Sequence, residues 1–364
     1  MTSDLRSRTL LPHVLAALYG LALVYASLQP FAPWISPAPG TPFWPFAAWP
    51  LRSTHFDLIA NMVAYIPLGL FVALMPHRAP PADRACVAFA ASATLAFMLE
   101  TSQMFLPPRD ANLLDFLANT AGGVAGGALG STLVRAHGLR ETLSDARSRV
   151  FLEGRLGDVG IALLVIWLAA QLNPGISFFA VTFDPAPAQA APATVFGMGG
   201  DRAGVLIEAA QSALQLVGVG LFVALLLRDR RYVSGAILLL LGSALVSKGI
   251  AAALILKPAA LETWLRPGVA IGIAAGALVL LPAVYLRRPA QVAACATALL
   301  ASLLLPFLSS DLFSADAPLT LFNWRYGHLL NFNGLTHSVL LAWPIAAALW
   351  LFALAGRPEW GRPQ

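Results

Sequence analysis

Ten stretches of apolar residues recur along the chain, each close in length to a membrane-spanning helix. They lie at about 10–29, 57–75, 85–106, 113–134, 157–172, 205–227, 233–256, 267–286, 289–305 and 335–356. A helix needs roughly 20 apolar residues to cross a bilayer, and lipid offers no hydrogen-bond partner to irregular backbone. The weak alternating pattern of barrel strands is absent. The pattern predicts an all-α, polytopic membrane helix bundle of about ten transmembrane helices.

Composition and charge refine this prediction. Of the residues, 58% are hydrophobic and 11% charged, against about 25% charged in soluble domains. With a cytoplasmic N-terminus, sixteen of the 23 lysines and arginines fall in inner segments and six in outer segments. Positive residues gather on the cytoplasmic side, so both termini are expected there. The scarcity of lysine favours a bacterial source, and we expect a multi-pass protein of the bacterial cytoplasmic (inner) membrane.

The first apolar run has two interpretations. Arg6 and Arg8 precede it and Val24-Tyr25-Ala26 stands near its end, as in a cleavable signal peptide. Its apolar length of about 20 residues exceeds the core of about 7–15 residues in such peptides. We therefore expect an uncleaved anchor, and cleavage would leave the orientation of the later helices unchanged.

The loops divide the chain into three predicted parts. Residues 1–134 form a four-helix membrane module, and residues 157–364 form a six-helix membrane extension. Between them, residues 135–156 are rich in arginine and place Leu139, Leu143, Ala146 and Val150 at helical spacing. This segment is a basic cytoplasmic linker and favours a short surface helix on anionic lipid.

Polar side chains cluster at the predicted outer ends of the second, third and fourth apolar runs. Asp57 and Asn61 are four residues apart, so they share one helix face. A carboxylate or amide in hydrocarbon is costly unless it is paired or wetted, so such groups mark a bundle interior or a site. The predicted polar cluster consists of Asp57, Asn61, Glu100, Gln103, Arg109, Asp115 and Asn119.

A short pattern occurs twice in this region. Asp57-Leu-Ile-Ala-Asn61 matches Asp115-Phe-Leu-Ala-Asn119 in pattern, each at the start of a helix predicted to run inward. Unless the match is chance, it predicts two parallel repeats of one helical hairpin. Residues expected to shape helix packing are Pro67, Gly69, Gly122, Gly126 and Gly130, because proline kinks a helix and spaced glycines let helices approach closely.

Residues from about 55 to 130 resemble the VanZ-like family of small membrane proteins. The resemblance rests on Asp57-x3-Asn61 with Pro67 and Gly69, Glu100-x2-Gln103, Arg109, Asp115-x3-Asn119, and the glycines that follow. It implies an envelope-associated membrane protein, linked through the family's name to glycopeptide antibiotic resistance, whose polar residues matter. It implies no defined enzyme, and it leaves the helices after about residue 150 unassigned.

Secondary candidates lie in the C-terminal half. Glu208, Gln211 and Gln215 fall at helical spacing in the outer half of one helix, and Lys248 lies about two turns from the outer end of the next. Lys248 could extend to the interface or pair with Glu208 or the polar cluster. The last outer loop holds His328, Asn331 and Asn333, which suit a wet interfacial loop more than a ligand contact.

The predicted polar cluster leaves several functions open. Its side chains could only lock the helices together, could bind an envelope lipid or glycopeptide-type ligand on the outer face, or could act as acid and base on a lipid-linked precursor. Arg109 could hold a phosphate or carboxylate. A transporter needs polar groups near the midplane, and the inner halves of these helices are apolar. No catalytic triad, metal-spaced His/Cys set, cofactor motif or nucleic-acid-binding face is present, so we expect no metal, cofactor or nucleic acid and do not favour an enzyme.

Overall fold

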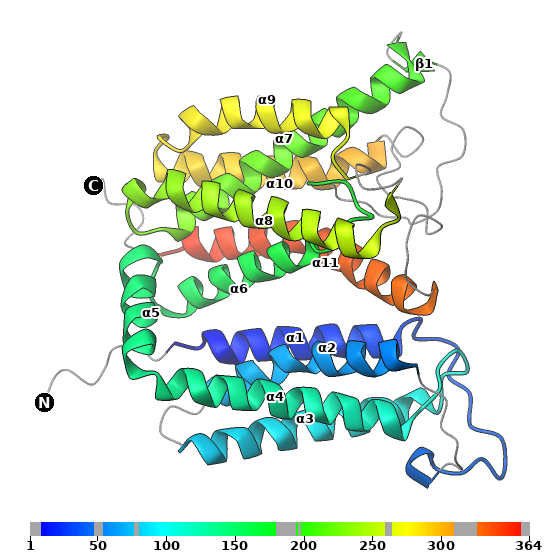
Figure 1. Ribbon diagram of the computed structural model, residues 1–364. Helices are drawn as coiled ribbons and strands as arrows, with labels where there is room; N and C mark the ends of the chain where they lie inside the picture. The colour runs from blue at the N-terminus through cyan, green and yellow to red at the C-terminus, as the bar shows by residue number, and fades with distance from the viewer. Residues whose placement is uncertain are drawn as a thin grey trace, which may run out of the picture. The chain divides into compact units, whose positions relative to one another are not determined.

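The computed structural model describes residues 9–46, 54–75, 80–179, 194–195, 198–258, 264–308 and 326–357. The chain divides into two compact units, residues 1–148 and 149–364. The elements of the N-terminal unit are α1 (Leu11–Leu28), the 3₁₀ turn η1 (Trp44–Phe46), α2 (His55–Leu74), α3 (Pro81–Gln103), α4 (Leu113–Arg135) and α5 (His137–Val150), whose last residues begin the next unit. Figure 1 shows α1 to α4 lying alongside one another, with α5 running across the end of α4.

The C-terminal unit is also helical apart from one pair of two-residue strands. Its elements are α6 (Gly154–Ala170), β1 (Thr194–Val195), β2 (Met198–Gly199), α7 (Gly200–Leu226), the 3₁₀ turn η2 (Arg230–Tyr232), α8 (Val233–Ile255), α9 (Pro267–Ala283), α10 (Arg288–Leu308) and α11 (Tyr326–Ala355). The division into a four-helix module, a linker and a six-helix extension stays a prediction.

Each of the ten predicted apolar runs coincides with a helix, so the all-helical fold is confirmed. Within the described residues, seven helices are long and apolar enough to cross a membrane: α1, α2, α3, α7, α8, α10 and α11. Large apolar side chains such as Leu239, Leu278 and Phe352 are exposed on the helix surfaces, where only lipid would solvate them favourably. These features indicate a multi-pass membrane protein. The count of ten spans and the cytoplasmic position of the termini stay predictions.

The start of the last helix was predicted wrongly. Residues 326–334 were expected in a loop, but α11 begins at Tyr326, and its first part includes polar residues. The reason is a tertiary contact: the side-chain amide of Asn173 donates to Asn333 Oδ1 and to Thr336 Oγ1, both at 2.7 Å. Polar residues that read as a loop are thus accommodated in a helix by a buried partner.

Glycines bring α4 against α2 in the N-terminal unit. A Cβ atom added at Gly122 would overlap the backbone of Met62, and one added at Gly126 would overlap the backbone of Ile66. Facing residues therefore keep a constant offset of 60 in number, which means that the two helices run parallel. Proline cannot continue the backbone hydrogen bonding of a helix, yet α2 includes Pro67 without ending there.

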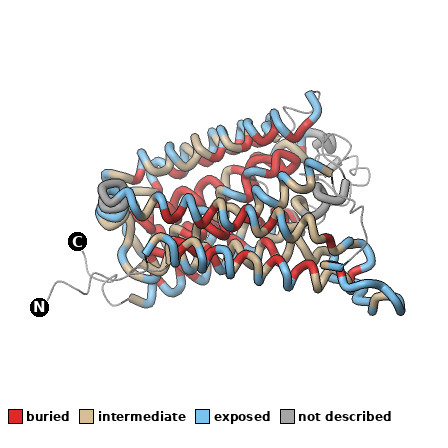
Figure 2. Tube along the Cα trace, turned by 60° about the horizontal axis from the view of Figure 1, so that its bottom comes forward, coloured by how far each residue is buried: buried red, intermediate tan, exposed pale blue. Residues whose placement is uncertain are grey.

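The opposite side of α4 packs against α3. An added Cβ would meet Ser92 at Gly123 and would lie 2.8 Å from Ala88 Cβ at Gly127. Here the residue numbers rise on one helix as they fall on the other, so α3 and α4 are antiparallel. Figure 2 shows the resulting distribution, with buried positions on the facing sides of helices and exposed positions on their outer sides.

The C-terminal unit is built around α7, most of whose residues are buried. In α9, a Cβ added at Gly272 would meet Ala209 and Ser212 of α7. A Cβ added at Gly276 would meet Ala213. Because the residue numbers rise together on both helices, α9 runs parallel to α7. Gln215 of α7 donates to Ser302 of α10 at 2.8 Å, on a helix that runs antiparallel. The large apolar side chains of this core include Phe222, Trp343 and Trp350.

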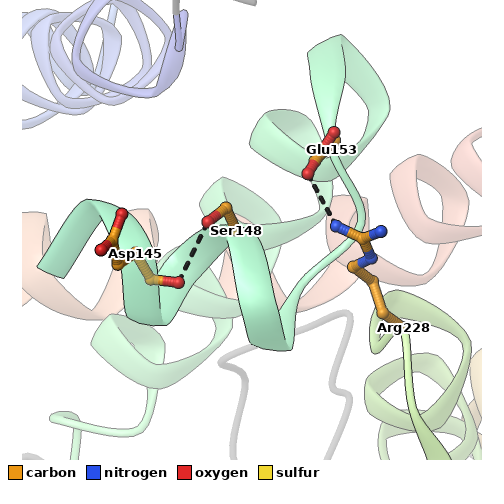
Figure 3. A network of polar contacts seen from close by, with 4 residues as sticks. All are labelled: Asp145, Ser148, Glu153 and Arg228. Carbon is orange, nitrogen blue, oxygen red and sulfur yellow. Dashed lines mark hydrogen bonds and ion pairs between the residues drawn. The ribbon is translucent and has the colours of Figure 1, made fainter. Parts of the chain in front are cut away.

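Figure 3 shows one polar contact within α5 and one between the segment that follows α5 and the segment that follows α7. Ser148 Oγ donates to the carbonyl oxygen of Asp145 at 3.0 Å, and Arg228 Nη1 donates to Glu153 Oε1 at 2.6 Å. Backbone bonds from Leu152 to Leu226 and from Arg228 to residue 150 accompany the ion pair. Both charged side chains are about half exposed, so the pair contributes at most roughly 1 kcal/mol.

Candidate functional site

The packing registers place the predicted acidic residues at one end of the N-terminal unit. Because Ser92 faces Gly123 on an antiparallel neighbour, Glu100, eight residues further along α3, is level with Asp115 on α4. The parallel register of α2 and α4 places Asp57 about level with residue 117. All three lie where α2 and α4 begin and α3 ends. At 1.5 Å rise per residue, these positions differ in depth by only about 3 Å.

Glu100 is the most deeply buried of the acidic side chains in this group. Its side chain is 3% exposed, and its Oε2 accepts a hydrogen bond of 2.8 Å from the backbone N–H of Asn112. Asn112, itself buried, caps α4 by accepting from the N–H of Leu114 at 3.0 Å. Glu100 thereby orders the start of α4. Its charge also lies within electrostatic range of Asp115, Arg109 and Tyr65.

Several buried oxygen atoms on α2 and α4 have no hydrogen-bond partner. Asn119, on the face of α4 that carries Gly123, is 7% exposed and its Oδ1 is unpartnered. The hydroxyl of Tyr65 on α2 and that of Thr120 on α4 are unpartnered as well. A buried polar group without a partner costs roughly 1–3 kcal/mol, so several of them on two packed helices are unusual in a region that only packs. We name Tyr65, Glu100, Asp115, Asn119 and Thr120 the Glu100 site.

Asp57 and Asn61 lie at the same end but contribute differently. Asp57 forms a capping box: its Oδ2 accepts from Thr54 N at 3.0 Å and from Thr54 Oγ1 at 2.6 Å, while Thr54 Oγ1 accepts from Asp57 N at 3.2 Å. This accounts for Asp57 as the start signal of α2. Asn61 is partly exposed. The structure therefore gives Asp57 a capping role in α2 apart from the Glu100 site.

Gln103 and Arg109 hold the C-terminal end of α1. Gln103 Nε2 donates to Ser27 O at 3.0 Å, and Arg109 donates from Nη2 to Ala26 O at 2.7 Å and from Nε to Gln29 O at 3.1 Å. The last carbonyls of a helix lack internal partners and carry partial negative charge. Burial lowers the pKa of Arg109, and the charge of Glu100 partly offsets that shift. Arg109 is thus accounted for without a bound phosphate or carboxylate.

We expect Arg109→Lys to destabilise the N-terminal unit. A lysine presents one nitrogen, so it cannot bond the carbonyls of Ala26 and Gln29 in the fork geometry of a guanidinium. A hydrogen bond to a charged group contributes about 1.5–3 kcal/mol, and thermal unfolding in detergent should show a loss of that order. Arg228→Lys is the matched control, because its exposed pair with Glu153 should change stability by less than about 1 kcal/mol. Equal losses in the two variants would contradict the capping role.

Aromatic side chains cover part of the same end. Trp44, in the loop after α1, is 3% exposed, and its Nε1 donates to Thr101 Oγ1 of α3 at 3.1 Å. Its ring lies 5.6 Å from that of Phe97 and 5.4 Å from that of Phe116. The backbone of the loop also bonds α3's following turn, from Ile35 N to Phe105 O at 2.9 Å. Part of the loop between α1 and α2 is therefore packed on α3 and α4.

The secondary candidates of the C-terminal unit do not form one group. Lys248 is 1% exposed, and its Nζ donates to the carbonyls of Asn173 at 2.8 Å and Gln171 at 3.4 Å, which follow the end of α6. It therefore does not extend to the interface. Glu208 lies 3.4 Å from Ser177 Oγ and 3.9 Å from Arg266 Nη1. The side chains of His328 and Asn331 lie outside the described residues, as does Arg325.

Some contributors could not be found from the sequence. Tyr65 stands in an apolar run, Trp44 in a loop rich in aromatic residues, and Asn112 in a turn. The only available signal was the N-cap preference of Asn112. In the described part of the chain, no three His, Cys, Asp or Glu residues are grouped as metal ligands would be.

A protein-family model matches the N-terminal part of the chain. No curated protein and no solved structure matches the chain. The segment that the family model matches runs from within α1 to the last turn of α4 and includes every residue of the Glu100 site. Residues 13–134 match the family model described as VanZ/LLP1, which confirms the resemblance and supports a VanZ-like assignment for the N-terminal unit.

Proposed function

We propose that this protein lies in the bacterial cytoplasmic membrane and binds the headgroup of an envelope lipid or glycopeptide-type ligand at the Glu100 site. The observation that carries the proposal is the set of unpartnered buried oxygens on Tyr65, Asn119 and Thr120 in the same four helices as the buried Glu100, which interacts electrostatically with Tyr65. The bias of positive residues toward the predicted inner segments supports an outward position for this end of the unit.

The chemistry of the site favours a particular class of headgroup. Carboxylate and amide oxygens accept hydrogen bonds, and the hydroxyls of Tyr65 and Thr120 can donate or accept. Arg109, the one cation near Glu100 among the described residues, has two of its donors occupied by the carbonyls of α1. The site therefore suits a headgroup that offers hydroxyl, amide or ammonium donors, such as a sugar or a peptide, better than a bare phosphate.

The proposal includes a role in glycopeptide resistance, which the resemblance to the VanZ-like family and the proposed ligand support. A protein that holds a sugar- or peptide-bearing envelope lipid could alter how much of it an antibiotic can reach. A second candidate is an acid–base enzyme acting on the same lipid, favoured by the common level of Glu100 and Asp115 on α3 and α4. Two neighbouring carboxyl groups can differ in protonation and so act as acid and base.

Native mass spectrometry of the purified protein tests the proposal through the lipids it retains from its host membrane. Glu100→Gln keeps an acceptor for the N–H of Asn112 but replaces the carboxyl group by an amide, and Asn119→Ala removes the unpartnered Oδ1. We expect each variant to fold and to retain a headgroup-bearing lipid at least tenfold less than the unaltered protein. Glu153→Gln, the same chemical change at an exposed position, should retain it fully.

The two candidate functions give different results in this experiment. If Glu100→Gln keeps the lipid but a precursor-modifying activity disappears, the enzyme is favoured over the binding protein. Undiminished lipid retention in both variants, together with normal unfolding temperatures, would mean that the Glu100 site only packs the helices.

A further inference from the structure

The C-terminal unit repeats a sequence found in α2. Gly69-Leu-Phe-Val-Ala-Leu74 of α2 is identical to Gly220-Leu-Phe-Val-Ala-Leu225 of α7. In both helices an acidic residue stands twelve positions before the glycine, Asp57 in α2 and Glu208 in α7. Two helices of different units thus share a six-residue sequence and carry an acid twelve positions before it.

The helices that carry this repeat also pack in the same manner. Gly69 lies against α4 and Gly220 against α9, and both partners run parallel to the helix they cover. The offset between facing residues is about 60 in each pair: Ile66 faces Gly126, and Ala209 lies against Gly272 at nearly the same offset. The antiparallel neighbour differs, since α3 packs on α4 but α10 packs on α7. The similarity between the two units is therefore limited to the parallel helix pairs, α2 with α4 and α7 with α9.

The second pair has its own buried amide without a partner. Gln211 of α7 is 1% exposed, and neither its Oε1 nor its Nε2 has a hydrogen-bond partner. It lies on the α7 face that carries Gln215, which donates to Ser302 of α10. Residue 306 of α10 is a proline, which has no backbone N–H. It therefore cannot give the carbonyl oxygen of Ser302, four residues earlier, the hydrogen bond that a helix normally provides. Leaving a whole carboxamide unsatisfied inside a membrane protein is costly, which marks the position as a site.

Glu208 lies about one turn before Gln211, and its carboxylate has only long contacts with the side chains of Ser177 and Arg266. It is 6% exposed, its contacts with Ser177 Oγ and Arg266 Nη1 are long at 3.4 and 3.9 Å, and it accepts from the backbone of Gly268 at the start of α9. Its carboxylate thus adds an acceptor to the donor and acceptor of Gln211. Lys248 forms no hydrogen bond or ion pair with either of these two side chains and bonds carbonyls after α6 instead.

We propose that α7 and α9 repeat the parallel pair α2 and α4, and that Gln211 and Glu208 form a second headgroup site in the C-terminal unit. This inference rests on the proposed function, because it assigns the second site the same class of ligand, a membrane lipid whose headgroup carries hydroxyl or amide groups. A carboxamide both donates and accepts hydrogen bonds, which hydroxyl and amide groups satisfy and a phosphate cannot. The protein would then hold two such lipids, one in each unit.

Counting bound lipids tests the proposal. Delipidated full-length protein is titrated with a polar lipid extract of the expression host, and the adducts are counted by native mass spectrometry. We expect two headgroup-bearing adducts on the unaltered protein, one on Gln211→Met, one on Asn119→Ala and none on the double variant. Methionine matches glutamine in length and lacks polar atoms that need partners, so Gln211→Met should fold and resist heating at least as well as the unaltered protein.

Gln291→Met is the matched control, since Gln291 is buried in α10 but its amide is bonded to Val284 O at 2.6 Å. It should lose stability and keep both adducts. If Gln211→Met keeps the adduct count of the unaltered protein while Asn119→Ala loses one, the second site is refuted and the first stands. If Gln211→Met loses an adduct while Asn119→Ala keeps both, the second site is supported and the first is refuted. If the unaltered protein binds no adduct, both sites are refuted.

Discussion

Gly126→Ala should lower the stability of the N-terminal unit by about 3 kcal/mol or more. The added methyl group would overlap the backbone oxygen of Ile66, and a backbone atom cannot move aside as a flexible side chain can. Overpacking of this kind typically costs about 1–3 kcal/mol, and here the whole of α4 must move away from α2. The change would be measured as a fall in the unfolding temperature in detergent.

Gly20→Ala separates this steric effect from the general effect of replacing glycine. Gly20 lies within α1, and nothing lies within 4 Å of an added Cβ. Alanine is favoured over glycine in a helix by roughly 0.5–1 kcal/mol, so this variant should be as stable as the unaltered protein or slightly more so. Similar losses in both variants would show that close contact between α2 and α4 is not what the glycines provide.

The effect of Gly126→Ala should also reach the Glu100 site. Asn119 lies two turns before Gly126 on the same helix, and its neighbour Thr120 belongs to the same group of unpartnered oxygens. Small residues let helices pack closely in membranes, and this contact fixes the depth of Asn119 and Thr120 on α4 relative to Tyr65 on α2. We expect lipid retention to fall in this variant together with the unfolding temperature.

The helices could be predicted from the sequence because lipid imposes a simple rule. Each span must satisfy its own backbone, so long apolar runs read directly as helices, and all ten runs became helices. The start of α11 could not be predicted, since its helical state depends on Asn173, more than 150 residues away in sequence. Polar residues at a helix end carry no sign of whether they meet water or a buried partner.

Part of the candidate site could be predicted for a similar reason. Alternating helix direction and the positive-inside rule placed Glu100, Asp115 and Asn119 at one end, and the packing registers place them there. The phosphate- or carboxylate-binding role of Arg109 was predicted from its charge alone. Its hydrogen bonds to the carbonyls at the end of α1 could not be predicted, because they depend on the path of the chain between the helices. Tyr65 was missed because a tyrosine in an apolar run is usually a core residue.

Trp44→Ala is expected to release the loop that packs on α3 and α4. Removing a buried tryptophan costs about 3–5 kcal/mol, and here the variant also loses the bond to Thr101 and the ring contacts with Phe97 and Phe116. Since Trp44 belongs to the loop and not to a helix, the cost should appear as undocking of residues 30–46. We expect faster proteolysis and faster amide exchange of that segment, with a smaller change in the unfolding of the helices.

Trp34→Ala distinguishes docking from a general loss of aromatic surface. Trp34 lies in the same loop, is 53% exposed and makes no recorded ring contact, so its removal should leave proteolysis of the loop unchanged. Phe116 joins the cover to the helix that carries Asp115, so undocking should also loosen the Glu100 site and reduce lipid retention in Trp44→Ala. If the loop of Trp44→Ala is released but lipid retention is intact, the aromatic cover plays no part in holding the ligand, and the binding energy must come from the polar groups beneath it.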